Sequence, residues 1–393
     1  MKIVYAGQEA PDTYSKSLFL VGPTPRSPND LPARLRQHWR AAMLEALYVA
    51  GYDGVVFIPE PENGKWPEDY FDQVEWEQKY IEQADLVLAW VPRDLTGMPA
   101  FTTNVEFGEI LASGKLIYGR PEGAPKTRYL DARYKAVWGR EPLSSLEGMA
   151  KAAVARLGPG AARTGPERRV PLDQWKTKQF QAWYAAQMGA DNRLDDARVL
   201  WSFFVGRDKS FLFCFTLWVK VWVASENRHK SNEFIFSRTD ISTIVAFYQD
   251  ETLPKTKIVL VKEFRSPART RDGFIYELPG GSSFKANEDP LEVASHELEE
   301  ETNLKIDPSR FTMMESRQVG ATLSTHHAVV FAVELTAEEM AQAELLAISG
   351  EHFGVETDSE QTYVQVGTLQ EIMEDNLCDW ATLGMIWQAV YDG

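Results

Sequence analysis

The chain has 393 residues, of which 44% are hydrophobic, and its formal net charge is −16. This length favours two or three domains with packed cores, and the acidic balance argues against nucleic acid or an anionic membrane surface as a partner. The first residues contain no apolar signal segment, and the longest apolar run, 211–223, is too short to span a bilayer. Two cysteines, Cys214 and Cys378, make no disulfide framework. A cytoplasmic location is therefore expected.

Residues 1–157 alternate between strand-like and helix-like segments. Short apolar runs predict strands at 17–23, 54–60, 85–92 and 116–121. Helical spacing of apolar residues predicts helices at 31–52, 71–84 and 102–115. This alternation is typical of an α/β domain with a parallel sheet covered by helices. Ligands of such sheets bind at the carboxyl ends of the strands.

Glycine and proline punctuate the stretch 158–171, "GPGAARTGPERRVP", which has no apolar periodicity. Such a composition predicts a linker, which we place at 158–172. The remaining residues, 173–393, form the second predicted domain. Its segments 199–206, 211–224, 232–238, 241–250 and 257–264 are predicted strands, with helices at 290–302 and near 381–391. This order is typical of an α+β domain with an antiparallel or mixed sheet.

The predicted helix 290–302 carries the acidic run "HELEEETNL". Asp289 is the expected N-cap, and Glu297, Glu300 and Glu301 have the spacing i, i+3 and i+4. Like charges at this spacing repel, and most acidic runs are only solvated faces. A divalent cation would offset the repulsion, because Mg²⁺ prefers carboxylate oxygens. The preceding "YELPGG" turn could offer backbone carbonyls to the same ion.

The segment "GGSSFKANEDPLEVASHELEEETNL" resembles the Nudix box, G-x5-E-x7-R-E-U-x-E-E-x-G-U. It differs in a first loop that is one residue longer, in His296 at the arginine position, and in Asn303 at the final glycine. Asparagine tolerates the left-handed end of a helix, so the last change is conservative. Because histidine is only partly charged at neutral pH, His296 predicts weaker or altered activity.

The Nudix resemblance implies a second domain with the Nudix fold that hydrolyses a nucleoside diphosphate derivative. Residues 197–393 resemble in particular the ADP-ribose pyrophosphatases. Mg²⁺ or Mn²⁺ would be held by side chains of the acidic helix and the carbonyl of the glycine turn, and the catalytic and substrate-binding residues would lie nearby. The implied metal ligands are Glu297, Glu300, Glu301 and Gly281. Glu300 and Glu301 would also take part in catalysis, with Glu356 or Glu360 as the general base. Arg265 and Glu277 would contact the substrate. Arg265 has a competing interpretation as a surface salt bridge. Any homodimer is expected to form through this domain.

In the first domain, Glu106 follows the loop "TTN" after a predicted strand. A helix N-terminus there would stabilise its carboxylate, as suits a nucleophile. The alternative is a capping-box glutamate that serves Thr103.

The order of segments over residues 1–157 resembles the nucleoside 2-deoxyribosyltransferase-like superfamily. This resemblance implies an α/β Rossmann-like parallel sheet. It also implies that Glu106 is the nucleophile and that Glu77 is an acid near the sugar. The Gly22–Pro23 turn would line the base or phosphate site. An aspartate of the classical transferases is replaced by Ala100, for which Asn104 is a substitute.

Together the resemblances imply a bifunctional enzyme of nucleotide metabolism. One domain would cleave or transfer an N-glycosidic bond through an oxocarbenium-like centre. The other would hydrolyse a diphosphate such as ADP-ribose. The alternatives are a nucleotide-sensing regulator whose first domain only binds its ligand, and a house-cleaning nucleoside triphosphate pyrophosphatase.

Overall fold

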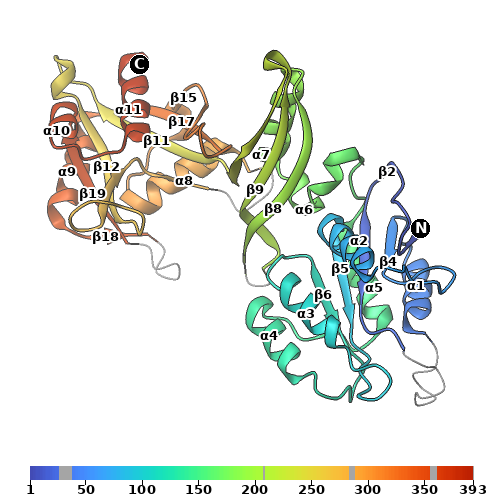
Figure 1. Cartoon of the computed structure of the whole chain (residues 1–393). Helices are drawn as coiled ribbons and strands as arrows, with labels where there is room; N and C mark the ends of the chain where they lie inside the picture. Colours follow the sequence, from blue (N-terminus) through green and yellow to red (C-terminus); the bar gives the residue numbers. More distant parts are fainter. Residues whose placement is uncertain (26–37, 207–208, 283–287, 355–360, 393) are drawn as a thin grey trace. The chain divides into compact units, whose positions relative to one another are not determined.

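The computed structural model describes residues 1–25, 38–206, 209–282, 288–354 and 361–392 (Figure 1). The chain forms two compact units, Met1–Ser237 and Arg238–Gly393. Within the described ranges, helices are all too short or too polar to cross a membrane.

The first unit is built on a parallel sheet of five strands in the order β1-β4-β3-β5-β6. The strands are β1 (Lys2–Tyr5), β3 (Ser17–Val21), β4 (Val55–Ile58), β5 (Leu86–Trp90) and β6 (Leu116–Gly119). The helices are α1 (Trp39–Val49), α2 (Tyr70–Gln83), α3 (Phe101–Ile110), α4 (Arg128–Trp138) and α5 (Leu146–Leu157). The predicted α/β parallel sheet is confirmed. The predicted helix 31–52 is seen from Trp39 onward, since residues 31–37 lie outside the described ranges.

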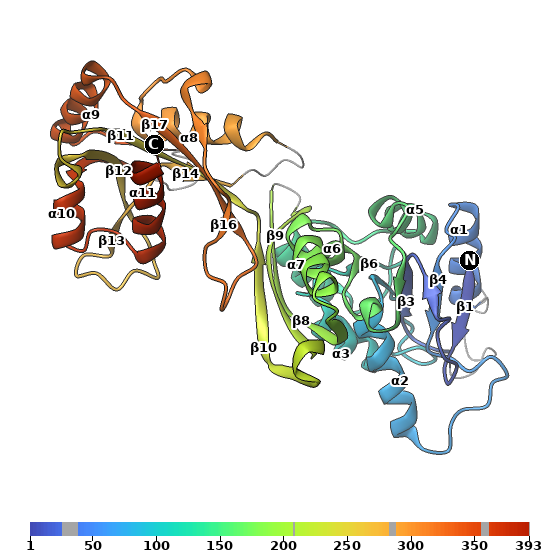
Figure 2. The ribbon, with the colours of Figure 1, turned by 90° about the horizontal axis from the view of Figure 1, so that it is seen from above.

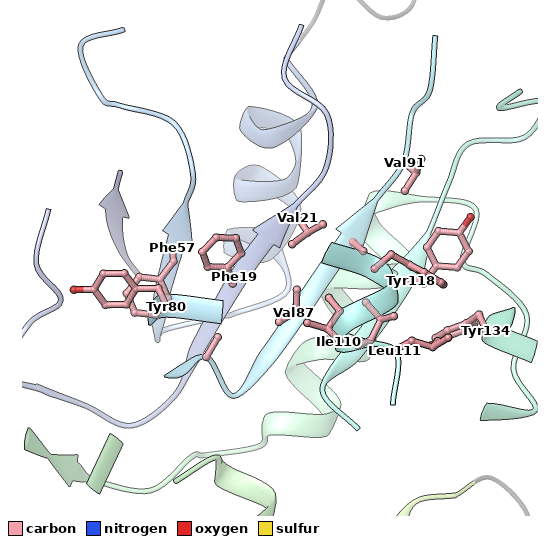
Figure 3. Packing of buried hydrophobic residues seen from close by; sticks show 14 of the residues in the cluster. Phe19, Val21, Phe57, Tyr80, Val87, Val91, Ile110, Leu111, Tyr118 and Tyr134 are labelled. Carbon is pink, nitrogen blue, oxygen red and sulfur yellow. The ribbon is translucent and has the colours of Figure 1, made fainter. Parts of the chain in front are cut away.

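Helices cover both faces of this sheet, because residues of the buried strands alternate between two cores. Phe19 and Phe57 pack with α2, α3 and α4 on one face, as Figure 3 shows for part of this core. Leu18 and Val56 pack with α1 and α5 on the other face. The continuous apolar character of the strands therefore follows from their burial on both sides.

The stretch 158–172 is part of the first unit and is not the predicted linker. Its strand β7 (Arg163–Thr164) pairs with β2 (Thr13–Tyr14). The side chain of Arg163 is fully buried and donates two hydrogen bonds of 2.8 and 2.7 Å to Asp85. Gly160 has φ +79° and packs its α-carbon against the carbonyl of Ser15, a place where a Cβ would collide. Glycine is thus required at this position, because the backbone is left-handed and lies directly against Ser15.

The remainder of the first unit pairs two helices with a sheet of three long strands. These elements are α6 (Leu172–Trp175), α7 (Lys178–Gly189), β8 (Arg193–Val205), β9 (Phe211–Val223) and β10 (Arg228–Arg238), with the strand order β10-β9-β8. Trp175 and Phe180 pack on one face of this sheet. The predicted second domain therefore begins too early: its first 65 residues or so belong to the first compact unit.

The second unit contains a mixed sheet in the order β15-β17-β11-β12-β19-β18, with β13, β14 and β16 paired beside it. Its strands are β11 (Ile241–Tyr248), β12 (Lys257–Phe264), β13 (Phe274–Glu277), β14 (Gly280–Gly281), β15 (Thr312–Met313), β16 (Arg317–Gln318), β17 (His327–Glu334), β18 (His352–Phe353) and β19 (Thr362–Thr368). Its helices are α8 (Pro290–Thr302), α9 (Ala337–Ser349), α10 (Leu369–Glu374) and α11 (Trp380–Asp392).

Helices cover both faces of the mixed sheet (Figure 2). Ile244 and Ala246 of β11 face α8 and α9. Val245 and Phe247 face α10 and α11. The mixed sheet agrees with the predicted antiparallel or mixed sheet. The strand β11 pairs in parallel with β17 and is buried on both faces, which explains its continuous apolar run.

Candidate active site

The candidate active site lies at the carboxyl ends of β3, β4 and β5. The chain leaves β3 for β4 on one side and then crosses to β5 on the other, so the strand order reverses beside β3. In open parallel sheets ligands bind at such a switch point. Gly22 follows β3, Glu60 follows β4, and α3 follows β5. The topology therefore brings these three segments to one edge.

Arg40 connects the segments that follow β3 and β4. It lies in the first turn of α1 and is only 3% exposed. Its guanidinium donates to the carbonyl of Gly22 and to Glu60, each at 2.6 Å. Burial acts to raise the pKa of Glu60, but the hydrogen bonds from His38 and Thr24 and the charge of Arg40 outweigh it, so this pKa falls to about 2. Glu60 is therefore the ionised partner of Arg40.

Glu106 and Glu77 share the field of the same guanidinium. Arg40 interacts electrostatically with both carboxylates as well as with Glu60. Burial, and next the charge of Glu77, raise the pKa of Glu106 to about 7, against the opposing effect of Arg40. Burial also raises the pKa of Glu77, against a 2.7 Å hydrogen bond from Gln73. Two predicted site residues thus form a carboxyl pair whose pKa values are raised, as is common in catalytic sites.

Glu106 does not lie at the N-terminus of α3, and this part of the prediction is wrong. The helix begins at Phe101, so Glu106 is in its second turn, beyond the strongest influence of the helix dipole. The alternative role as a capping glutamate is also wrong, because Thr103 is inside the helix and buried. The N-cap is Ala100, which adopts a left-handed conformation (φ 61°) and is 5% exposed. The environment of Glu106 is therefore set by burial and by neighbouring charges.

Asn104 lies across the helix from Glu106, since two residues correspond to about 200° of helical rotation. Its side-chain oxygen accepts a hydrogen bond from Arg93, which is itself 6% exposed and also donates to the carbonyl of Lys126. The structure therefore does not bring Asn104 to the carboxyl pair.

Gly22 and Pro23 shape the site through their backbone. A Cβ at Gly22 would lie 2.4 Å from the carbonyl oxygen of Trp90 and 2.5 Å from the ring of Trp39. The carbonyl of Gly22 accepts from Arg40, and that of Pro23 accepts from Trp39 at 2.9 Å. Both residues thus lie at the predicted edge, with their carbonyl groups engaged within the protein.

Sequence reasoning missed Arg40, Glu60 and Gln73. A signal for Arg40 was present: it falls on the buried stripe of α1, with Met43 and Leu47 at three and seven residues further on. A charged residue at an apolar position is buried only with partners. Glu60 and Gln73 carried no comparable signal, because their burial depends on segments distant in the sequence.

In the second unit, the acidic helix α8 packs against the glycine turn. Glu301 is 2% exposed and accepts a hydrogen bond of 2.9 Å from the backbone N–H of Gly280. The carboxylate of Glu297 lies so close to Gly281 that a Cβ there would be 2.2 Å from one of its oxygens. Glu300 instead contacts His296 at 3.2 Å. Two of the three predicted metal ligands thus meet at Gly280–Gly281.

Carboxylate oxygens are the ligands that a divalent cation prefers, but only two carboxylates of the described residues meet at this turn, one fewer than predicted. In the part of the chain that the structure describes, no three His, Cys, Asp or Glu side chains are grouped to hold a metal ion. Glu356 and Glu360 lie outside the described residues. Asp289 caps α8 and Asn303 ends it in a left-handed conformation, as predicted.

Arg265 pairs with two carboxylates of the same unit. It donates to Glu277 at 2.7 Å and lies 2.8 Å from Glu263. Burial would lower the pKa of Arg265, but the charge of Glu277 and its hydrogen bonds raise it above its ordinary value. This geometry agrees with the competing interpretation, in which Arg265 forms a salt bridge within the protein. Arg265 and Glu277 engage each other, and the charge of Glu301 acts on the same guanidinium.

The comparisons with known proteins bear on the first unit. A family described as nucleoside 2-deoxyribosyltransferase like matches residues 15–124. The matched segment contains Arg40, Glu60, Glu77 and Glu106, that is, the buried guanidinium and the carboxylates around it. This part of the chain is therefore similar to that family, as predicted. A search of the curated proteins found no match.

Proposed function

We propose that the first unit cleaves or transfers the N-glycosidic bond of a nucleoside or nucleotide. The observation that carries this proposal is the half-buried pair of Glu77 and Glu106 beside Arg40, at the carboxyl edge of the sheet. The similarity of residues 15–124 to the nucleoside 2-deoxyribosyltransferase-like family supports the substrate class.

In the proposed reaction, the ionised carboxylate of Glu106 attacks the anomeric carbon of the sugar. The bond to the base breaks, and the base leaves with the bonding pair and takes up a proton from solvent water. A glycosyl ester on Glu106 forms and is then opened by water or by an acceptor base, as in retaining glycosidases. Arg40 holds Glu60 in an ion pair, so that the guanidinium neutralises Glu106 only in part. With a pKa of about 7, Glu106 is partly ionised at neutral pH, and its ionised form is the nucleophile.

The test is a panel of nucleosides, nucleotides and dinucleotides, incubated with the full chain and with EDTA, and followed by mass detection of free base. Release of base from at least one member supports the proposal. If ligands bind with measurable affinity but release no base, the first unit is a sensor and the regulatory alternative replaces this function.

The rate of base release should rise with pH through about 7, the pKa of Glu106, because the nucleophile must be ionised. Glu77→Gln should move this rising limb to lower pH by roughly half a unit to one unit, since a like charge is removed. The limb should stay above 4.5, because burial, the larger cause of the shift, remains. Profiles of kcat/KM for both proteins give the answer. An unmoved or alkaline-shifted limb would show that Glu77 does not act on Glu106.

For the second unit we propose hydrolysis of a diphosphate linkage, as in ADP-ribose, with Mg²⁺ or Mn²⁺. The observation that favours it is the meeting of Glu297 and Glu301 at Gly280–Gly281. A nucleoside triphosphate is the alternative substrate, as in a house-cleaning pyrophosphatase. Consecutive action of the two units on one metabolite, with base removal before diphosphate cleavage, is part of this proposal.

Glu300→Gln should abolish Mg²⁺-dependent release of AMP and ribose 5-phosphate from ADP-ribose, because it removes one carboxylate charge without changing shape. Glu299→Gln is the matched control on the same helix, as Glu299 pairs only peripherally with Lys305 at 2.7 Å. Chromatographic quantification of AMP and ribose 5-phosphate at saturating Mg²⁺ is the measurement. Equal activity of the two variants would remove Glu300 from the metal site, and turnover of triphosphates alone would exclude ADP-ribose as the substrate.

A further inference from the structure

Gln73 is a buried polar residue of α2, one helical turn before Glu77. It is only 4% exposed. Its side-chain nitrogen donates to a carboxylate oxygen of Glu77 at 2.7 Å and to the backbone carbonyl of Pro59 at 3.2 Å. Residues four apart on a helix lie on the same face, and Pro59 directly follows β4. One carboxamide thus links α2 with the segment after β4 at the candidate active site.

The two partners determine the orientation of this carboxamide. A backbone carbonyl can only accept a hydrogen bond, so the end that faces Pro59 must be the NH₂ group. That group carries two hydrogens, and the ionised carboxylate of Glu77 accepts the second one. In the flipped orientation the carboxamide oxygen of Gln73 would face two acceptors, and all three groups would be left unsatisfied. The position of the NH₂ group is therefore fixed by its surroundings.

The same contact fixes the carboxyl group of Glu77. Its Oε1 atom accepts from Gln73, and within the described ranges no hydrogen bond to its Oε2 atom is found. When Glu77 is protonated, the proton belongs on Oε2, because a proton on Oε1 would face the N–H groups of Gln73. Glu77 is partly exposed. Oε2 is thus the oxygen that is left for a ligand.

The hydrogen bond also influences the charge of the carboxyl pair. Burial raises the pKa of Glu77, whereas the hydrogen bond from Gln73, and next the charge of Arg40 on α1, oppose this rise. The charge of Glu77, like that of Glu109 on α3, raises the pKa of Glu106. Without the hydrogen bond, Glu77 should stay protonated to higher pH and repel the charge of Glu106 less. Gln73 therefore acts on Glu106 through Glu77.

We propose that Gln73 is a positioning residue for the reaction of the first unit. It holds the carboxyl group of Glu77 in one orientation, so that Oε2 is free for a hydrogen bond with a hydroxyl of the substrate sugar. Gln73 itself does not touch the substrate. This inference rests on the function proposed above for Glu77 and Glu106.

The experiment is a double-mutant cycle in the full chain, with Gln73→Met, Glu77→Ala and both together, followed by base release from about pH 5 to about pH 9. Gln73→Met should lower kcat/KM about tenfold or more, mainly through a higher KM, because a contact formed in the substrate complex is weakened. Its rising pH limb should move to lower pH, as with Glu77→Ala but by less. Gln78→Met, at an exposed position of the same helix, is the matched control and should behave as the parent.

In the Glu77→Ala background, Gln73→Met should change kcat/KM by less than about twofold, because the group that it positions is gone. Equal losses in both backgrounds, or an unmoved pH limb, would show a purely structural role and overturn this inference. Gln73→Asn keeps the carboxamide but withdraws it from Glu77, and should give the same KM and pH effects if Gln73→Met folds poorly. Absence of base release by the parent would instead contradict the proposed function itself.

Discussion

Glu106→Gln is expected to reduce base release by about 10³-fold or more, because the amide keeps the shape of the side chain and removes the nucleophile. The loss should be the same with and without EDTA. The variant should leave diphosphate hydrolysis by the second unit unchanged, since that unit has its own core. The measurement is kcat/KM for base release, determined by chromatography of the free base.

Two further variants separate a nucleophile from a structural residue. Glu106→Ala leaves space for a small anion, so that azide or formate should restore part of the activity, as expected for a missing carboxylate nucleophile. Glu45→Gln, on the exposed side of α1, is the control for loss of one negative charge and should behave as the parent. Full activity of Glu106→Gln would contradict the proposed role of Glu106, whereas absent rescue with intact folding would assign it to substrate positioning.

The same substitution has an independent effect on stability. The pKa of Glu106 is raised from 4.5 to about 7 in the folded protein, so the folded state binds more protons than the unfolded state between these values. Its contribution to stability is therefore lost as the pH rises through this window. Glu106→Gln should be more stable than the parent at pH 8, by roughly 2 kcal/mol, and should differ less at pH 4.5. Denaturant unfolding at both pH values checks the sign.

Arg163→Met is expected to cost about 3–5 kcal/mol of unfolding free energy, because it leaves Asp85 charged and buried without its partner. Both side chains are fully buried. Asp85 also accepts hydrogen bonds from the backbone N–H groups of Ser17 and Leu172, at 2.9 and 3.0 Å. One carboxylate thus ties together β3, β5 and the start of α6. Urea unfolding followed by far-ultraviolet circular dichroism is the measurement.

Lys135→Met provides the control, because its ion pair with Glu141 is exposed and should contribute less than about 1 kcal/mol. The buried pair of Arg163 and Asp85 also predicts how fragments of the chain behave. A fragment ending at residue 158 lacks Arg163 and should not fold cooperatively, whereas one ending at Ser237 contains the whole first unit and should fold. Cooperative unfolding of the shorter fragment would show that the segment after residue 158 is dispensable for this core.

The fold of the first unit was largely predictable from local patterns. Its strands are short apolar runs closed by turns, and helices at 71–84 and 102–115 were expected close to α2 and α3. α3 ends early, at Ile110, because a turn precedes Gly114, which has φ +82°. The prediction failed at 158–172, because this segment has the composition of a linker but packs on the first unit through Arg163 and residues 170–172. Glycine and proline report local turns and say nothing about what the turn packs against.

Some residues of the candidate site could be identified from the sequence alone, and others could not. Glu77 and Glu106 were named from the sequence, and in the structure the charge of Glu77 acts on the carboxyl group of Glu106. Asn104 was also named, but the helical rotation places it with Arg93. Arg40 was missed, although its charge acts on both carboxyl groups, because its hydrogen-bond partners are 18 and 20 residues away in other loops.

The amino-acid sequence alone was sufficient for the alternation of strands and helices, for the parallel sheet of the first unit, and for the caps of α8 at Asp289 and Asn303. These features follow from backbone preferences and from the periodicity of burial, which act within about a dozen residues. Only the tertiary structure decided that Arg163 completes the first core and that Arg40 joins the carboxyl pair. It also decided that the first unit extends to Ser237. The pairing of Arg163 with Asp85 spans 78 residues, and a buried charge takes whichever partner the packed chain places beside it.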